Sequence, residues 1–268
     1  MRKFKRKDHQ KNKISKISLL HYSKLVFRTL LLLAFGTEYL VNRMNHIKRF
    51  PIVFAVIWLF FAVEMLLRFF PSKVESMGCQ KQFARYYQQS TKNTVPKLQS
   101  AKATAIVAGF WLLLNGGIGV LYFFSILDTG MLILVSLLFS VCDMICILFF
   151  CPFQTWVMKN KCCVSCRIYN WDYAMMFTPL LFIPNGFTWS LLAIAIALLI
   201  KWEILYHRNP ERFSETTNVS LSCANCEEKL CAHKKQLQGF LRKKYADLQE
   251  EVATRRVAFK SERCKYRK

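Results

Sequence analysis

Two cysteine pairs, each with two residues between its members, flank the last long apolar stretch of the chain. Cys163 and Cys166 precede the stretch, and Cys223 and Cys226 follow it. A Cys-x-x-Cys turn lets two thiolates bind one ion, and two such turns complete the tetrahedral site that zinc prefers. The doubled pattern therefore predicts a metal site made by these four cysteines.

Further metal-binding side chains surround the two pairs. Cys162 precedes the first pair, and the second pair continues to Cys231 and His233. Three arrangements stay open: one zinc shared by both pairs, zinc held by the C-terminal ligands alone, or an iron–sulfur cluster. Zinc is favoured because a closed four-ligand site needs no other machinery, and no flavin or nucleotide fingerprint is present. The remaining alternative is a set of free thiols near a membrane.

Two acidic residues stand inside apolar stretches, where a charge costs about 2.5–3.5 kcal/mol at the centre of a spanning helix. Glu64 is followed four residues later by Arg68, a spacing that favours a pair on one helix face. Asp143 has no basic residue within one turn and is flanked by Cys142 and Cys146. Asp143, Cys142 and Cys146 could line an ion path or a buried metal site; the favoured alternative is that Asp143 hydrogen-bonds to another helix while the cysteines act as small apolar residues.

Other polar residues in apolar stretches suggest packing rather than chemistry. Asn115 opens the run Asn-Gly-Gly-Ile-Gly, whose small side chains let helices approach closely while the amide bonds across. Arg28 is expected to extend its guanidinium to the membrane interface, as long basic side chains do near helix ends.

The elements that position these residues are predicted from the apolar runs. The chain is 53% hydrophobic over 268 residues, and its runs approach the roughly 20 residues that cross a bilayer as a helix. We therefore predict an all-α polytopic membrane protein with six segments arranged as three helical hairpins. The predicted segments are residues 25–41, 51–70, 103–127, 131–151, 168–183 and 187–205.

The last hairpin follows from a break in residues 173–200. One straight helix there would be about 42 Å long, which exceeds a hydrocarbon core of about 30 Å. Pro184-Asn185-Gly186 is a turn sequence, so we split the stretch at that point. The first arm also contains Pro179, and we expect it to be short and only partly helical.

Charge sets the predicted orientation and divides the chain into three parts. A basic arm (residues 1–24) precedes the membrane domain (25–206), whose connector 153–172 carries cysteines, and a basic tail (207–268) follows. With six segments, nearly all loop and tail Lys and Arg lie on one side, and Arg43, Lys48 and Arg49 are the exceptions. We expect that side to be the cytoplasm of a plasma or inner membrane, with both termini inside.

The net charge of +23 favours contact with anionic lipid headgroups, and the sequence contains no motif specific for nucleic-acid binding. Within the tail, apolar residues recur at helical spacing over 237–252, which predicts an amphipathic helix that lies on headgroups or binds a partner protein.

Three functional hypotheses follow. The first is a membrane protein with a cytoplasmic cysteine-bound metal that has a structural, scaffolding or regulatory role. The second is a membrane redox protein, either an iron–sulfur electron carrier or a dithiol oxidoreductase. In its Cys-x-x-Cys motif and several predicted spans, the chain resembles membrane thiol oxidoreductases of the vitamin K epoxide reductase type, and the resemblance covers that one short motif only. The third is a small ion or metal transporter that uses Asp143, the cysteines and the broken fifth segment.

Overall fold

The computed structural model describes residues 16–42, 51–71, 80–91, 94–160, 162 and 165–222. The chain divides into two compact units, Met1–Glu228 and Lys229–Lys268, and all described residues belong to the first. Regular structure within the described residues is helical, apart from one isolated bridge between Gln89 and Asn218. The all-α prediction is therefore confirmed for this part of the chain.

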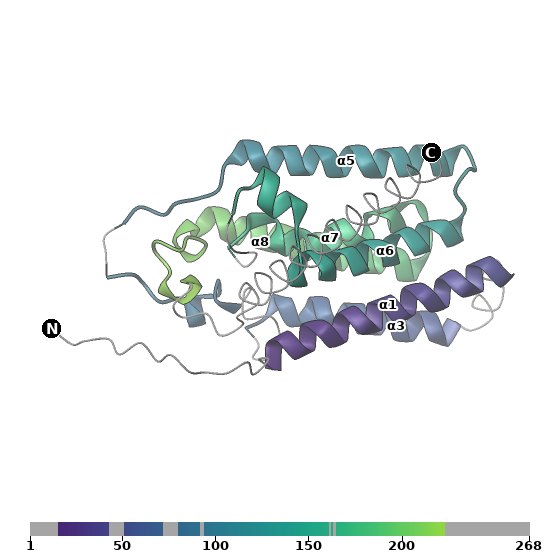
Figure 1. Ribbon diagram of the computed structural model, residues 1–268, viewed down its shortest axis with the longest axis horizontal. Coiled ribbons are helices and arrows are strands. Elements are labelled where there is room, and N and C mark those ends of the chain that lie inside the picture. Colours follow the sequence, from purple (N-terminus) through teal and green to yellow (C-terminus); the bar gives the residue numbers. More distant parts are fainter. Residues whose placement is uncertain are drawn as a thin grey trace, which may run out of the picture. The chain divides into compact units, whose positions relative to one another are not determined.

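Five long helices form the framework of the described part (Figure 1). They are α1 (Lys16–Asn42), α3 (Pro51–Phe69), α5 (Ala101–Phe123), α6 (Thr129–Leu148) and α8 (Gly186–Arg208). Among the described residues, four helices are long and apolar enough to cross a membrane, namely α5, α6, α8 and Ile52–Phe69 of α3. The helix α1 is not one of these four and begins well before the predicted start at residue 25.

The predicted fifth segment is broken into short pieces. The chain forms a 3-10 turn η3 (Arg167–Trp171), a short helix α7 (Asp172–Phe177) and a second 3-10 turn η4 (Thr178–Phe182). Pro179 lies in the first turn of η4, where its ring and missing N–H prevent α7 from continuing. The chain then turns, and the Asn185 side chain caps α8 by accepting a hydrogen bond from the Phe187 amide, 3.0 Å away.

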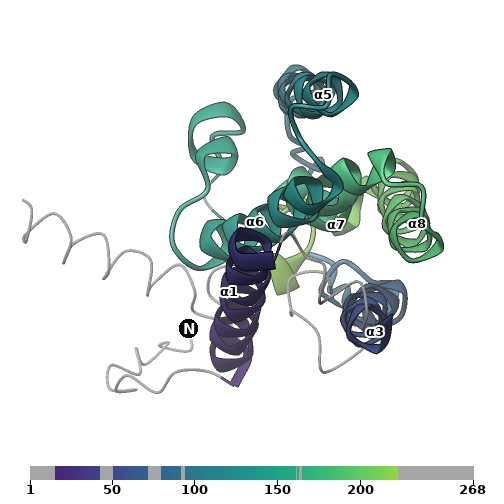
Figure 2. The ribbon, with the colours of Figure 1, turned by 90° about the vertical axis from the view of Figure 1, so that its right-hand side faces the viewer.

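The long helices pack unequally around this broken segment. Helix α1 packs on α6, α3 packs on α8, and α7 lies against both α6 and α8 (Figure 2). Helix α5 rests mainly on η4 and on η2, a π-helical segment at Phe153–Val157. Few α5 side chains are buried, and Figure 2 shows the helix standing apart from the others. Its attachment therefore leaves space between it and α6.

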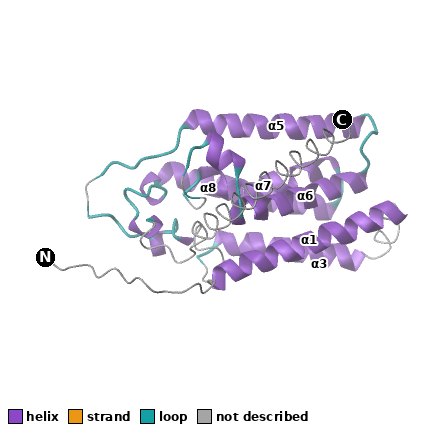
Figure 3. Cartoon of the chain, viewed as in Figure 1, coloured by secondary structure: helices purple, strands orange, loops and turns teal. Residues whose placement is uncertain are grey.

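Most of the long connections gather at one end of the helices, where they form a polar layer that we call the cap (residues 80–91, 94–100 and 209–222; Figure 3). Asn218 is 0% exposed and donates to the carbonyl oxygens of Lys81 and Arg212, at 3.0 and 2.9 Å. Ser165 of the connector donates to Glu215 Oε1 at 3.0 Å. The cap thus joins the start of the tail to two earlier connections.

Candidate functional site

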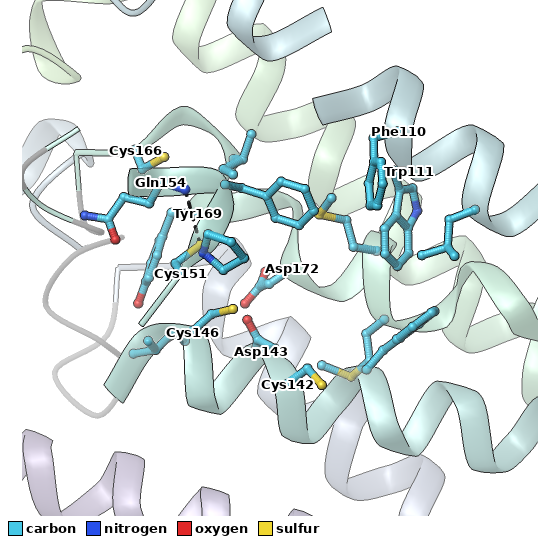
Figure 4. Close-up of a pocket in the computed structure, with 18 residues that line it drawn as sticks. Phe110, Trp111, Cys142, Asp143, Cys146, Cys151, Gln154, Cys166, Tyr169 and Asp172 are labelled. Atoms are coloured by element: carbon cyan, nitrogen blue, oxygen red, sulfur yellow. Dashed lines mark hydrogen bonds between the residues drawn. The ribbon is translucent and has the colours of Figure 1, made fainter. Parts of the chain in front are cut away.

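A cavity of about 300 Å³ lies between α5, α6, α7, η2 and η3 (Figure 4). This volume is at the lower end of the range of about 300–1,000 Å³ that small-molecule pockets occupy. Apolar side chains, many of them aromatic, form most of its wall, and two carboxylates, four cysteines and Gln154 add polar groups. The cavity is large enough for a small solute.

Aromatic rings contributed by α5, α6 and η2 form one wall. The Trp111 and Phe139 ring centroids are 5.0 Å apart, and those of Phe110 and Phe153 are 5.6 Å apart. The Trp111 indole N–H donates to Thr178 Oγ1 at 3.2 Å, which ties α5 to the broken segment. These contacts hold flat apolar faces toward the cavity.

Two carboxylates face each other in the cavity lining (Figure 4). Asp143 comes from α6, and its Oδ2 lies 3.2 Å from Arg28 Nη1. Asp172 begins α7, and its Oδ2 lies 2.6 Å from Arg68 Nη1. The two arginine side chains are 1% and 2% exposed and lie behind the carboxylates, outside the cavity lining. No Lys, Arg or His is among the described lining residues, so the carboxylate of each ion pair lines the cavity and the guanidinium does not.

The arginines belong to a larger buried cluster of charges. Glu64 is bound by Lys24 at 3.0 Å and by Arg28 at 2.9 Å, and it accepts a hydrogen bond from the Tyr173 hydroxyl at 3.2 Å. The Arg68 guanidinium lies 4.5 Å from the centre of the Tyr173 ring. Within the described part of the chain, the cluster contains three cations (Lys24, Arg28, Arg68) and three carboxylates (Glu64, Asp143, Asp172). Its formal charges cancel, as buried charges require.

Two expectations about these residues need correction. Glu64 takes its partners from α1 rather than from Arg68, because Arg68 is directed to Asp172 on α7. Arg28 does not extend to an interface, because it is buried between Glu64 and Asp143. For Asp143, the expected bond to another helix is confirmed by its pair with Arg28 of α1, and its side chain also lines a cavity, while an ion path or a metal site there stays a prediction.

Sequence reasoning did not predict Lys24, and it considered Asp172 only as a group supporting the predicted metal site, not as the partner of Arg68. One signal could have revealed them. Several acidic and basic residues lie in or beside apolar stretches, and charges buried there must pair with opposite charges, including charges on other helices. Spacing along one helix could not reveal which pairs form, because the partners lie on different helices.

Four cysteines line the same cavity: Cys142, Cys146, Cys151 and Cys166. The Cys146 and Cys151 thiols are hydrogen-bonded, and the Gln154 amide donates to Cys151 Sγ at 3.4 Å. No group of three or more metal-binding side chains occurs among the residues that the structure describes. In this region the four thiols line an apolar space.

The predicted metal site falls mostly outside the described residues. Cys166 is buried and lines the cavity, and Cys162 is half-buried. The other predicted ligands are outside the described part: Cys163, Cys223, Cys226, Cys231 and His233. The predicted amphipathic helix at 237–252 is also outside it, so both stay predictions.

An ion pair fixes η3 beside the cavity. The Arg167 guanidinium bonds to Glu203 of α8 and lies 4.4 Å from the centre of the Tyr206 ring. Burial disfavours the charged guanidinium, but the hydrogen bond and charge of Glu203 outweigh burial and raise the pKa of Arg167. Trp171 also donates to Glu203, at 2.7 Å. These contacts hold the start of the broken segment against α8.

The glycine-rich run of α5 makes one close approach. A Cβ atom at Gly119 would overlap the Phe182 ring, whereas Gly116 and Gly117 have nothing within 4 Å of that position. Asn115 donates to the Trp111 carbonyl oxygen of its own helix at 3.0 Å. The expected close packing therefore occurs at Gly119, against η4.

Fold and site together define a helical protein with four helices able to cross a membrane and a polar-ended cavity between them. No protein-family model matches the chain, and no curated protein or solved structure is significantly similar to it. The function is therefore inferred from the geometry and chemistry of the cavity.

Proposed function

We propose that this protein is a small membrane transporter whose solute enters the cavity between α5, α6 and α7. One observation carries the proposal: Asp143 is paired with Arg28 at one oxygen while its side chain, 16% exposed, still lines the cavity. Ionisable residues inside spanning helices commonly mark solute pathways. The adjacent segment is also broken at Pro179, and broken helices build binding sites in transporters.

The proposed topology has six segments with the cap in the cytoplasm. The long connections of the described part gather at the cap, and the turn at residues 124–128 lies at the other ends of α5 and α6. The segment from η3 to η4 counts as the short fifth one. This arrangement places both termini and most of the basic residues inside a plasma or inner membrane.

Solute uptake into proteoliposomes that contain the full chain tests the proposal. A panel of small organic solutes should include at least one whose uptake is lost in Asp143→Asn and after Cys142 is blocked with a bulky maleimide. Asp128→Asn is the matched control, because Asp128 lies outside the cavity and asparagine can keep both the cap of α6 and a hydrogen bond with the Tyr39 hydroxyl. Folded protein that transports no solute, and whose Cys142 resists maleimide, would refute the proposal.

A cysteine-bound zinc that fixes the tail to the connector is the second candidate function. The bond from Ser165 to Glu215 favours it, because Ser165 stands between Cys163 and Cys166 while Glu215 belongs to the stretch that leads to Cys223. Such a zinc would be structural, since the binding energy of a closed site is folding energy for the segments that it joins.

Metal analysis of detergent-purified protein tests this second candidate. We expect stoichiometric zinc in a colourless preparation, and its loss in the double variant Cys223→Ser with Cys226→Ser. Proteolysis of the tail should accelerate in that variant while the membrane helices stay intact. A brown preparation that bleaches on reduction would instead support the iron–sulfur redox alternative.

A further inference from the structure

The cavity wall offers flat aromatic faces. Phe110 and Trp111 of α5 pack on Phe153 and Phe139 along one wall, and Met175 and Met176 of α7 add soft apolar surface. An aromatic face attracts a ligand cation within about 6 Å of the ring centre, and the attraction grows when the cation is desolvated. The wall therefore accepts an apolar body and favours one that carries positive charge.

The polar end of the cavity has one sign of charge. Asp143 and Asp172 line it, while their partners Arg28 and Arg68 lie behind them and do not. The described members of the cluster balance in formal charge, but the carboxylates of Asp143 and Asp172 are nearer to the cavity than the guanidinium groups of Arg28 and Arg68. A positive solute in the cavity is therefore attracted, and an anion is repelled.

The cavity is open toward the side of the helices. Cys142 is exposed, and Phe110 and Leu114 of α5 are exposed as well as lining the cavity. Helix α5 packs mainly on η2 and η4 rather than on α6, so the side of the cavity between α5 and α6 stays open. A solute that arrives from the hydrocarbon must itself be partly apolar, which a bare metal ion is not.

We infer that the cavity binds small lipophilic organic cations of the quaternary or tertiary ammonium class. This inference rests on the proposed transport function and names its substrate class. The ammonium group lies at Asp143 and Asp172, and the apolar body lies against Trp111 and Phe139. Aromatic walls recognise quaternary ammonium groups, and the carboxylates supply the charge complement.

A pair of nearly isosteric probes tests the substrate class. Phenyltrimethylammonium carries the charge, and tert-butylbenzene has the same shape without it. In equilibrium dialysis with the full-length protein in detergent, we expect saturable binding of the cation and at least tenfold weaker binding of the neutral probe. Asp143→Asn should weaken cation binding at least tenfold, and Trp111→Leu should weaken it severalfold. Asp128→Asn, outside the cavity, should leave it unchanged.

A second variant covers the risk that Asp143→Asn fails to fold. Cys142→Trp fills the cavity mouth without touching the charge cluster, and it should abolish cation binding in a protein that keeps its melting temperature. Equal affinity for the two probes would refute the cation class while leaving the transport function in place. Binding of neither probe, with Cys142 unreactive toward maleimide, would refute both.

Discussion

Asp172 shows how the fold stabilises a single buried charge. One of its oxygens faces Arg68, and the other accepts a hydrogen bond from the Tyr173 amide at 2.9 Å. The two charges lose hydration together and compensate each other, so the pair is tolerated although neither charge alone would be. The same reasoning applies to Arg28 between Glu64 and Asp143.

Removing one member of this pair should therefore cost more than removing both. Arg68→Met leaves Asp172 buried without its counter-ion, and we expect a loss of about 3–5 kcal/mol of unfolding free energy. The double variant Arg68→Met with Asp172→Leu should recover a large part of that loss. Thermal unfolding in detergent measures both. Equal destabilisation of the single and double variants would show that the pair is not the reason for the burial.

Asn218 carries a second prediction, because its side chain joins three parts of the cap. Asn218→Ala leaves the carbonyl oxygens of Lys81 and Arg212 without a donor, at a cost of roughly 1–3 kcal/mol for each buried polar group left unsatisfied. Limited proteolysis of the cap should accelerate at least several-fold. Asn209→Ala is the control, since the Asn209 side chain makes no hydrogen bond within the described residues. Similar proteolysis rates for both variants would contradict this role.

Helices differ in how strongly the rest of the fold holds them. Helices α1, α3, α6, α7 and α8 share buried contacts, while α5 depends on a few positions such as Gly119 against Phe182. Length and hydropathy predicted α3, α5, α6 and α8 to within a few residues, because long apolar runs have few alternatives in lipid. Pro179 correctly predicted a partly helical fifth segment. The π-helical turn η2 was not predicted, because no residue type marks it.

Gly119 gives the prediction at the scale of elements. Gly119→Leu places a side chain where the Phe182 ring lies, and overpacking of this kind costs about 1–3 kcal/mol. The melting temperature should fall, and adding Phe182→Ala should restore part of it. Gly116→Leu is the matched control on the same helix, because nothing lies within 4 Å of its Cβ position. Equal melting temperatures for the two leucine variants would argue against the contact.

For the whole molecule, sequence reasoning reached the class of fold but not the site. Hydropathy identified the membrane helices, yet the cavity and the cap depend on contacts between residues far apart in sequence, such as Arg28 with Asp143 and Asn218 with Lys81. A single sequence does not show which distant residues meet. The cysteine motif drew attention to the ligands after residue 222, while the described cysteines gather around a cavity.

Topology is the prediction at this scale. Reporter fusions before residue 1 and after residue 268 should both behave as cytoplasmic, because six segments return the chain to its starting side. A cysteine placed in the turn between α5 and α6, at Ser125, should react with an impermeant reagent added from outside. If the two termini were found on opposite sides of the membrane, the fifth segment could not be a crossing, and the tail would lie on the other side from the one proposed.

The ion pairs between α1 and α3 also bear on how the protein is made. In the proposed six-segment topology α1 brings Lys24 and Arg28 into the membrane, and both side chains find Glu64 only when α3 has arrived. At about 2.5–3.5 kcal/mol for each charge near a helix centre, α1 alone is a poor substrate for the insertion machinery. The two helices should therefore leave the translocon as one unit, and a nascent chain truncated before α3 should fail to integrate stably. Biosynthesis would then depend on the same charges that support the cavity, so variants in this cluster should lower the yield of protein before they affect its activity.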